Sequence, residues 1–396
     1  MKRYLIIAYL LFTGMVATQA KTEERISWEQ SLQQILDSLI TDDLFQTTQL
    51  GMMVWDLTAD SVLYAHHHMH RMRPASTMKL LTAITALDQF GSSHNFKTEL
   101  YYRGQIDSRT LRGDLLCVGG MDPAFDNADM RVFVDRVRTA GIDSICGHII
   151  GDKSMKDQLL LGEGWCWDDD NPILSPLLVS RKDNFTEQLR KELLSAGIVI
   201  ADSISDPLSS QHLIATCTHP MGQILKRMMK QSDNLYAESM FYHVATATGY
   251  PATVKNARSN VRRLIQKLGY NPASYYIADG SGLSLYNYVT PELLISFLRY
   301  AYQNNSIYAN LLPTLPVAGV DGTLKDRMKN TPAFQNVKAK TGTLTGISSL
   351  AGYCTGGNGH QLAFVIINQG IQSAKSGKTF QDKVCAALCT PLSDEL

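Results

Sequence analysis

The chain has 396 residues, of which 44% are hydrophobic and 19% are charged, so it is long enough for two or three domains with a large core. Lysine plus arginine and aspartate plus glutamate each number 37, which leaves no net charge at pH 7. Since there is no overall basic field and no basic run, we expect no nucleic-acid partner.

Residues 1–20 have the layout of a secretory signal peptide. Lys2 and Arg3 precede an apolar run from Tyr4 to Phe12, and small residues follow up to Ala20. This run is too short to span a bilayer as a stable helix, and no later stretch approaches 18 apolar residues. We therefore expect an exported protein without stable membrane insertion, and an uncleaved anchor is the alternative.

Seven cysteines follow the expected cleavage point, and their odd number leaves at least one thiol unpaired. Export permits disulfides, but the spacing does not fix their connectivity. Cys385 and Cys389 are four residues apart in a helical pattern, so we expect them to pack as small apolar residues on one helix face.

In chain order, residues 24–40 have the apolar period of a helix, and 50–57 and 61–67 read as a hairpin of strands. A helix over 76–90 ends at the Gly and Ser of "FGSS". Short strands are then expected within 98–120.

The pattern continues with alternating helices and strands. Expected helices are 128–141, the first part of 185–201, 219–248 (interrupted by S-D-N) and 376–389, and expected strands are 144–152, 336–346, 347–356 and 359–370. This order predicts an α/β (α+β) fold in which an antiparallel sheet, built from both ends of the chain, is flanked by helices. Residues 21–96 and 216–396 would form this domain, and 97–215 a smaller inserted α/β domain.

Ser76 and Lys79 lie three positions apart in "RPASTMKLLTAITAL". Residues i and i+3 share one face of a helix, so the two side chains can touch. A serine hydroxyl becomes nucleophilic when a base removes its proton, and burial can make a lysine neutral enough to be that base. The alternative is an N-cap serine beside a lysine that reaches water.

Two further triplets supply parts that such a site needs. Ser232 and Asn234 flank Asp233 in "KQSDNLYAES", and Lys340, Thr341 and Gly342 form K-T-G in "VKAKTGTLTG". S-x-x-K, S-D-N and K-T-G occur in the order found in serine acyl-transferases that recognise penicillin. We expect Gly342 to leave the strand without a side chain, so that a substrate can lie against it.

With these motifs the chain resembles the D-alanyl-D-alanine carboxypeptidase/endopeptidase family, the class C low-molecular-mass penicillin-binding proteins. Ser232 follows Ser76 by 156 positions, which matches the large insertion of that class. The segments 278–291 and 315–328 also resemble family signatures. The chain passes directly from "LLVSRKDN" (177–184) to a helix, so the insertion is shorter than we expect for the family.

The resemblance implies a role for each matching residue. Ser76 would be the acylated nucleophile, Lys79 its base, Ser232 the proton relay, and Asn234 the ligand of the acyl amide. Lys340 and Thr341 would bind the terminal carboxylate, and the backbone N–H groups of Ser76 and Thr343 would form an oxyanion hole. The implied partners are peptidoglycan stem peptides and β-lactam antibiotics, the implied location is the periplasm, and no metal or organic cofactor is implied.

Three other functions remain open on this evidence. A serine β-lactamase shares the acylation chemistry, although the chain lacks an E-x-x-L-N element. A D-amino-acid esterase or aminopeptidase on the same framework would look alike in these motifs. A catalytically silent peptidoglycan-binding relative would not need the complete nucleophile and base. Exo- and endo-cleavage, third-residue specificity and oligomeric state are not determined by the motifs.

Two other patterns are candidates for a metal site and a catalytic triplet. The histidines of "HHHMH" (66–70) invite a metal interpretation, but successive strand residues face opposite sides and no acidic or cysteine partner is evident. We expect a solvated strand end instead. Tyr308 and Asn310 form a Y-x-N that replaces S-D-N in some β-lactamases, and we interpret it as coincidence because S-D-N is intact.

Overall fold

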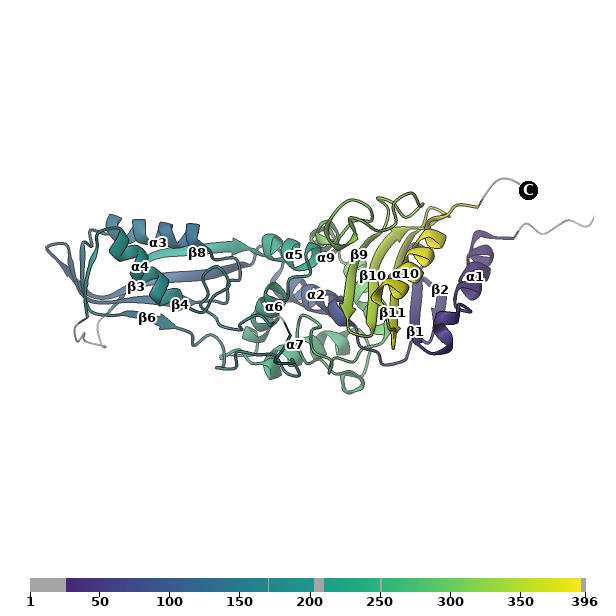
Figure 1. The fold of residues 1–396 in the computed structure, drawn as a ribbon, viewed down its shortest axis with the longest axis horizontal. Coiled ribbons are helices and arrows are strands. Elements are labelled where there is room, and N and C mark those ends of the chain that lie inside the picture. The colour runs from purple at the N-terminus through teal and green to yellow at the C-terminus, as the bar shows by residue number, and fades with distance from the viewer. Residues whose placement is uncertain (1–25, 170, 203–209, 250, 393–396) are drawn as a thin grey trace, which may run out of the picture.

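The chain forms two layered bodies that are joined by a central group of helices (Figure 1). The structure is a computed structural model that describes residues 26–169, 171–202, 210–249 and 251–392. The expected signal peptide, residues 1–20, lies outside the described residues. No helix in the described ranges is both long and apolar enough to cross a membrane.

The first body is built on a five-stranded sheet in the order β2-β1-β11-β10-β9. All neighbouring strands are antiparallel, and the pairing of β1 with β11 joins the two ends of the chain, as predicted. β9 lies at one edge of the sheet. The strands are β1 (Gln49–Asp56), β2 (Ser61–His66), β9 (Lys338–Leu344), β10 (Ile347–Thr355) and β11 (Gln361–Gln369).

Successive side chains of these strands enter two different cores, because a strand alternates its faces. Met52 and Val54 pack with α1 (Trp28–Leu39) and α10 (Ala374–Cys389) on one face. Met53 belongs to the larger core on the opposite face. Cys385 and Cys389 of α10 are buried in the first core, as expected, and all seven cysteines are free thiols.

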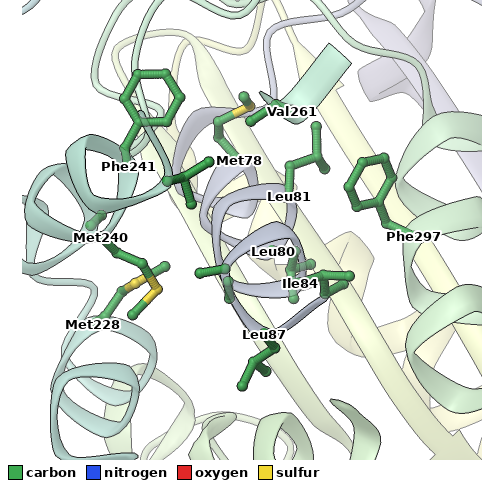
Figure 2. Packing of buried hydrophobic residues seen from close by; sticks show 14 of the residues in the cluster. Met78, Leu80, Leu81, Ile84, Leu87, Met228, Met240, Phe241, Val261 and Phe297 are labelled. Carbon is green, nitrogen blue, oxygen red and sulfur yellow. The ribbon is translucent and has the colours of Figure 1, made fainter. Parts of the chain in front are cut away.

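The larger core surrounds α2 (Met78–Phe90), which is buried from Met78 to Leu87. An all-round apolar helix is stable only when other elements cover every face. Figure 2 shows this cover, with Met240, Val261 and Phe297 pointing toward α2 and Phe241 beside its first turn. These side chains come from α6 (Asn234–Thr246), α7 (Val254–Lys267) and α8 (Pro291–Gln303), with α5 (Met221–Lys230) also in contact.

The second body contains a six-stranded sheet in the order β7-β5-β4-β3-β8, with β6 also paired to β4. Its three long strands pair antiparallel and its three short strands pair parallel. α3 (Asn127–Thr139) and α4 (Phe185–Ser195) pack on it through a separate core that includes Phe125, Phe133 and Phe185. The strands are β3 (Asn95–Asp107), β4 (Thr110–Gly119), β5 (Ser144–Cys146), β6 (Ile149–Asp152), β7 (Val199–Ala201) and β8 (Gln211–Pro220).

The expected limits of the insertion, 97 and 215, fall inside β3 and β8, so the second sheet spans Asn95 to Pro220. Sequence analysis assigned no elements to 249–335, where the structure has α7, α8, α9 (Asn305–Leu311) and the short η3, η4 and η5. The spacing of Ala257, Val261 and Leu264 was an available signal for α7.

Candidate active site

Ser76 lies in a single 3-10 turn, η2 (Ala75–Thr77), that leads into α2. Ala75 has a φ of 48°, in the left-handed region that non-glycine residues rarely adopt. Thr77 Oγ1 donates to the carbonyl oxygen of Pro74 at 2.7 Å and holds this turn. Strained backbone that is kept in place by its surroundings is common at functional sites.

Lys79 is fully buried one turn after Ser76. Its Nζ donates to Ser76 Oγ at 3.0 Å, to Asn234 Oδ1 at 2.8 Å and to the Ser281 carbonyl oxygen at 2.7 Å. Burial lowers the pKa of Lys79 to about 8, although nearby carboxylates oppose this shift. A substantial neutral fraction is therefore available near neutral pH to accept the proton of Ser76.

The S-D-N segment forms the turn before α6. Ser232 has a φ of 59°, and the Asp233 carboxylate caps the helix by accepting from the N–H groups of Leu235 and Tyr236. Asn234 is the first residue of α6, which directs its amide oxygen to Lys79. Asp233, the middle residue of the motif, thus fixes the orientation of Ser232 and Asn234.

Lys340 of β9 is also fully buried and faces the S-D-N turn. Its Nζ donates to Ser232 Oγ at 2.8 Å and to the Thr341 carbonyl oxygen at 2.7 Å. Burial, with a smaller contribution from the charge of Lys79, lowers the pKa of Lys340 well below its usual range. The structure therefore brings two serine–lysine pairs together, and Asn234 contacts one of the lysines.

Gly342 makes a different contact from the one expected. A Cβ at this position would lie 2.1 Å from Ser349 Oγ and 2.9 Å from both the Pro74 carbonyl oxygen and the Ser76 nitrogen. Ser349 Oγ instead donates to the Pro74 carbonyl oxygen at 2.6 Å. The missing side chain thus allows β9 and β10 to pack against the nucleophile turn, rather than only clearing space for substrate.

The two threonines of this strand face different surroundings. Thr341 Oγ1 donates to Thr323 Oγ1 at 2.7 Å, so a residue of η5 (Gly322–Leu324) that sequence analysis did not single out holds this hydroxyl. Thr343 is exposed and lies next to Gly342, which contacts the Ser76 backbone. Its position on edge strand β9 is compatible with the expected use of its N–H.

Glu238, a buried carboxyl group behind Lys79, was not predicted from the sequence. Glu238 of α6 accepts hydrogen bonds from the backbone N–H groups of Gly280 and Ser281, the latter at 2.7 Å. Burial and the neighbouring Asp279 raise the pKa of Glu238, whereas these hydrogen bonds oppose the rise. Because the Ser281 carbonyl accepts from Lys79, Glu238 fixes one of the three groups that orient the lysine.

Asp279 organises the rest of the same turn. Its carboxylate accepts from the N–H groups of Gly282 and Ser284, from Asn287 Nδ2 and from Trp165 Nε1. The "ADGSGLS" signature therefore marks a buried turn that supports Lys79, and Trp165 reaches it from the segment after β6. Gly282 has a φ of 81°, and a Cβ there would lie 1.9 Å from the Ala75 carbonyl oxygen, so this turn requires the glycine.

A pocket of roughly 410 Å³ lies beside Ser232 and Asn234. Asn171, Pro172 and Arg181 line its other side, so the segment between β6 and α4 contributes one wall. The histidine-rich segment 66–70 and the Y-x-N triplet at Tyr308 make aromatic contacts. His67 and His70 stack on each other with centroids 4.5 Å apart, and Tyr308 packs between Tyr302 and Tyr353.

Comparison with known proteins places this geometry in a family. Residues 32–178 and 177–389 match the D-Ala-D-Ala carboxypeptidase 3 (S13) family. The chain belongs to this family. The predicted class, a hydrolase of the D-Ala-D-Ala carboxypeptidase type, and the predicted α/β fold are thereby confirmed.

Individual members of the S13 family are distant relatives. D-alanyl-D-alanine carboxypeptidase DacB of Haemophilus influenzae is 26% identical, over 82% of this chain and 86% of the relative. The D-alanyl-D-alanine carboxypeptidase of Actinomadura sp. is 25% identical, over 90% of this chain and 84% of the relative. The crystal structure of penicillin-binding protein 4 (DacB) from H. influenzae superposes with a TM-score of 0.80 at 24% identity, covering 89% of this chain and 97% of that one.

Proposed function

We propose that this S13 member removes the terminal D-alanine from peptidoglycan stem peptides through an acyl-enzyme on Ser76. The observation that carries the proposal is the contact between the fully buried Lys79 Nζ and Ser76 Oγ, at 3.0 Å. A lysine kept from water and placed one hydrogen bond from a serine is an activating base, whereas a binding module needs neither group.

In the acylation step, neutral Lys79 accepts the proton of Ser76 while Ser76 Oγ attacks the carbonyl carbon between the two D-alanines. The backbone N–H groups of Ser76 and Thr343 would stabilise the oxyanion that forms. Asn234 Oδ1 is held by Lys79, which leaves the Asn234 amide N–H groups for a carbonyl of the acyl portion.

The departing amine needs a proton, and the Ser232–Lys340 pair is placed to deliver it. Ser232 would donate its hydroxyl proton to the leaving D-alanine and regain the proton that Lys79 took from Ser76, while its oxygen is held in place by Lys340. The same lysine, with Thr341, would attract the terminal carboxylate of the substrate. Water then attacks the ester on Ser76, which releases the shortened peptide and restores the serine.

Acylation by β-lactams and cleavage of cross-links belong to the same proposal. A crystal structure of H. influenzae penicillin-binding protein 4 in complex with a β-lactam superposes at TM-score 0.72 and 25% identity, covering 87% of this chain and 98% of that one. A β-lactam presents a strained amide to the nucleophile, so Ser76 would be acylated in the same way. Endopeptidase activity differs only in the space beyond the leaving group.

The deciding experiment is intact-protein mass spectrometry of residues 21–396 with benzylpenicillin over time. The wild type and the control Ser92→Ala, which changes an exposed serine, should gain one adduct that persists for minutes. Ser76→Ala should gain none and should release no D-alanine from a D-Ala-D-Ala peptide. An adduct that clears within seconds would favour a β-lactamase, and no adduct in the wild type would favour the silent relative.

We further propose that the protein is exported to the periplasm, on the support of Lys2, Arg3 and the apolar run up to Phe12. Cell fractionation followed by N-terminal sequencing would test this location. A mature protein that begins near residue 21 in the periplasmic fraction is the expected result. A protein that retains residue 1 and stays with the membrane would support the uncleaved anchor.

A further inference from the structure

A second cluster of chemically active side chains lies where the second sheet meets the central helices. Cys217 and His219 come from the end of β8, and Asp122 comes from the loop after β4. The Cys217 sulfur, a His219 ring nitrogen and an Asp122 carboxylate oxygen all lie within 4.8 Å of one another. Residues two apart on a strand share a face, so Cys217 and His219 point to the same side of β8.

The backbone holds the Asp122 carboxylate in a fixed orientation. Its side chain is fully buried, and Oδ1 accepts from the N–H of Ala124 at 3.0 Å. Oδ2 is thereby directed at His219 Nδ1, 2.7 Å away. Ligands of metal ions are oriented in this manner by hydrogen bonds from groups behind them.

The surroundings carry an excess of negative charge. Asp129 Oδ2 lies 3.7 Å from His219 Nε2, and Asp126 and Asp129 both act electrostatically on the Cys217 thiol. Among the ion pairs of the described residues, Asp122 and Asp129 have His219 as a partner and no lysine or arginine. Three carboxylates around one imidazole would be stabilised by a further cation.

A hydrogen-bonded pair of His219 and Asp122 explains two of the three side chains without a metal. The Cys217 thiol beside this pair has Asp129 as a hydrogen-bond partner, which is a weak interaction, and the same sulfur is a strong metal ligand once deprotonated. The combination of sulfur, imidazole nitrogen and carboxylate oxygen is the donor set typical of Zn²⁺ rather than of Mg²⁺ or Ca²⁺.

We propose that Cys217 Sγ, His219 Nδ1 and Asp122 Oδ2 bind one Zn²⁺ ion, with the fourth position facing Asp129. On binding, the ion displaces the proton of the Cys217 thiol and the proton that His219 Nδ1 donates to Asp122; both pass to the solvent, and the imidazole keeps its remaining proton on Nε2. None of the ligands belongs to the proposed catalytic machinery, so the ion has a structural role.

The location defines what the ion would stabilise. β8 continues directly into α5, which ends two residues before Ser232. On the other side, the Gly120 carbonyl oxygen, two residues before Asp122, accepts from His243 Nε2 of α6 at 2.7 Å. A metal bridge between β8 and the Asp122 loop would therefore tie the second sheet to the two helices that frame the S-D-N turn.

The test uses the untagged mature protein, purified under reducing conditions and freed of metal. We expect one Zn²⁺ per chain by calorimetry, and with Co²⁺ a near-ultraviolet thiolate-to-cobalt band. Cys217→Ser should abolish the band, and His219→Gln should weaken Zn²⁺ binding by at least roughly tenfold. Two controls should behave as wild type: Cys166→Ser, at an exposed cysteine, and His212→Gln, elsewhere on β8.

A second measurement distinguishes loss of the metal site from misfolding and from Zn²⁺ binding at the histidines of segment 66–70. Zn²⁺ should raise the melting temperature of the wild type but not of Cys217→Ser, while both proteins are acylated equally by benzylpenicillin. A His67→Gln/His70→Gln variant should keep the cobalt band. The proposal is overturned if the wild type binds no Zn²⁺, if Cys217→Ser retains the band, or if binding is lost only in the double histidine variant.

Discussion

Lys79 and Lys340 are fully buried, and each donates a hydrogen bond to a serine of the site. Burial disfavours the charged form of a lysine, and two buried ammonium groups that also repel each other cannot both be charged without a large cost. Burial of these two lysines is unfavourable for stability, but it suits them to proton transfer because the neutral amine becomes accessible near physiological pH.

The rate of benzylpenicillin acylation should rise with pH through about 8 and then level off. The reason is that burial lowers the pKa of Lys79 to about 8, and only the neutral amine can accept the proton of Ser76. Lys79→Arg should be as slow as Lys79→Ala, about 10³-fold or more below wild type, because a guanidinium stays protonated. Stopped-flow acylation across pH checks this, with the exposed Lys226→Ala as control.

Glu238 makes a separate prediction through its hydrogen bonds and its charge. Glu238→Ala should lower the free energy of unfolding by about 1–3 kcal/mol, since the buried N–H groups of Gly280 and Ser281 lose their acceptor. Glu238→Gln retains an acceptor oxygen and should be milder. Urea denaturation measures both variants, and equal losses would contradict the hydrogen-bond explanation.

The pH profile distinguishes a positioning role of Glu238 from a purely structural one. Its carboxylate raises the pKa of Lys79, in opposition to the larger effect of burial. Burial raises the pKa of Glu238 to about 8, so this carboxyl ionises over the same pH range as Lys79, and Glu238→Gln should shift the midpoint of the acylation profile slightly to lower pH. An unchanged midpoint with an unchanged rate would show that Glu238 does not act on the lysine.

At the scale of elements, the site depends on how closely β9 packs against η2. Ser349 of β10 reaches across the position of Gly342 to the Pro74 carbonyl oxygen, and this contact is open only because Gly342 has no Cβ. α2 is buried on every side, and α6 begins at the Asp233 cap. The turn before α2, the start of α6 and strand β9 are far apart in sequence, and this packing keeps their reactive side chains in contact.

Gly342→Ala should slow acylation by at least about tenfold, because the new Cβ would come 2.1 Å from Ser349 Oγ and 2.9 Å from the Ser76 nitrogen. Relief of these overlaps must move β9 away from the nucleophile turn, which misplaces the reacting groups. Gly222→Ala is the matched control, since a Cβ there on α5 meets no atom within 4 Å. It should leave acylation unchanged and make the protein slightly more stable, as expected of alanine in a helix.

At the scale of the whole molecule, the second body extends contacts into the active site of the first. Arg181, between β6 and α4, donates to Asp233 Oδ2 at 2.7 Å, and Arg227 of α5 donates to the same oxygen at 2.9 Å. Burial raises the pKa of Asp233, but the two arginines outweigh it, and the pKa lies below its usual value. The S-D-N turn is therefore held from both bodies.

Arg181→Met should lower the acylation rate a few-fold and change the free energy of unfolding by no more than about 1 kcal/mol. The small stability effect is expected because the arginine side chain is 45% exposed and ion pairs at such positions contribute little. Arg109→Met is the control, because its partner Asp143 lies within the second body. An acylation rate equal to wild type would mean that Arg227 alone holds Asp233.

The reactive groups and most of the helices and strands can be predicted from the order of residues alone. S-x-x-K, S-D-N and K-T-G name the reactive groups, because a nucleophile, its base and its relay must be of these residue types. Period-2 and period-3.6 patterns identified the first sheet, the second sheet without β8, the helices up to residue 248 and the last helix, since local burial leaves a direct trace in the chain.

The groups that support this chemistry are identified only in the folded chain. Glu238 and Thr323 act through contacts with residues 43 and 18 positions away in the sequence, Trp165 reaches Asp279 from 114 positions away, and no local pattern encodes such pairings. The close approach at Gly342 and the meeting of Cys217 with Asp122 likewise require the packed chain. Burial of Lys79 follows from the helices and the sheet that enclose α2, and its lowered pKa exists only once they assemble.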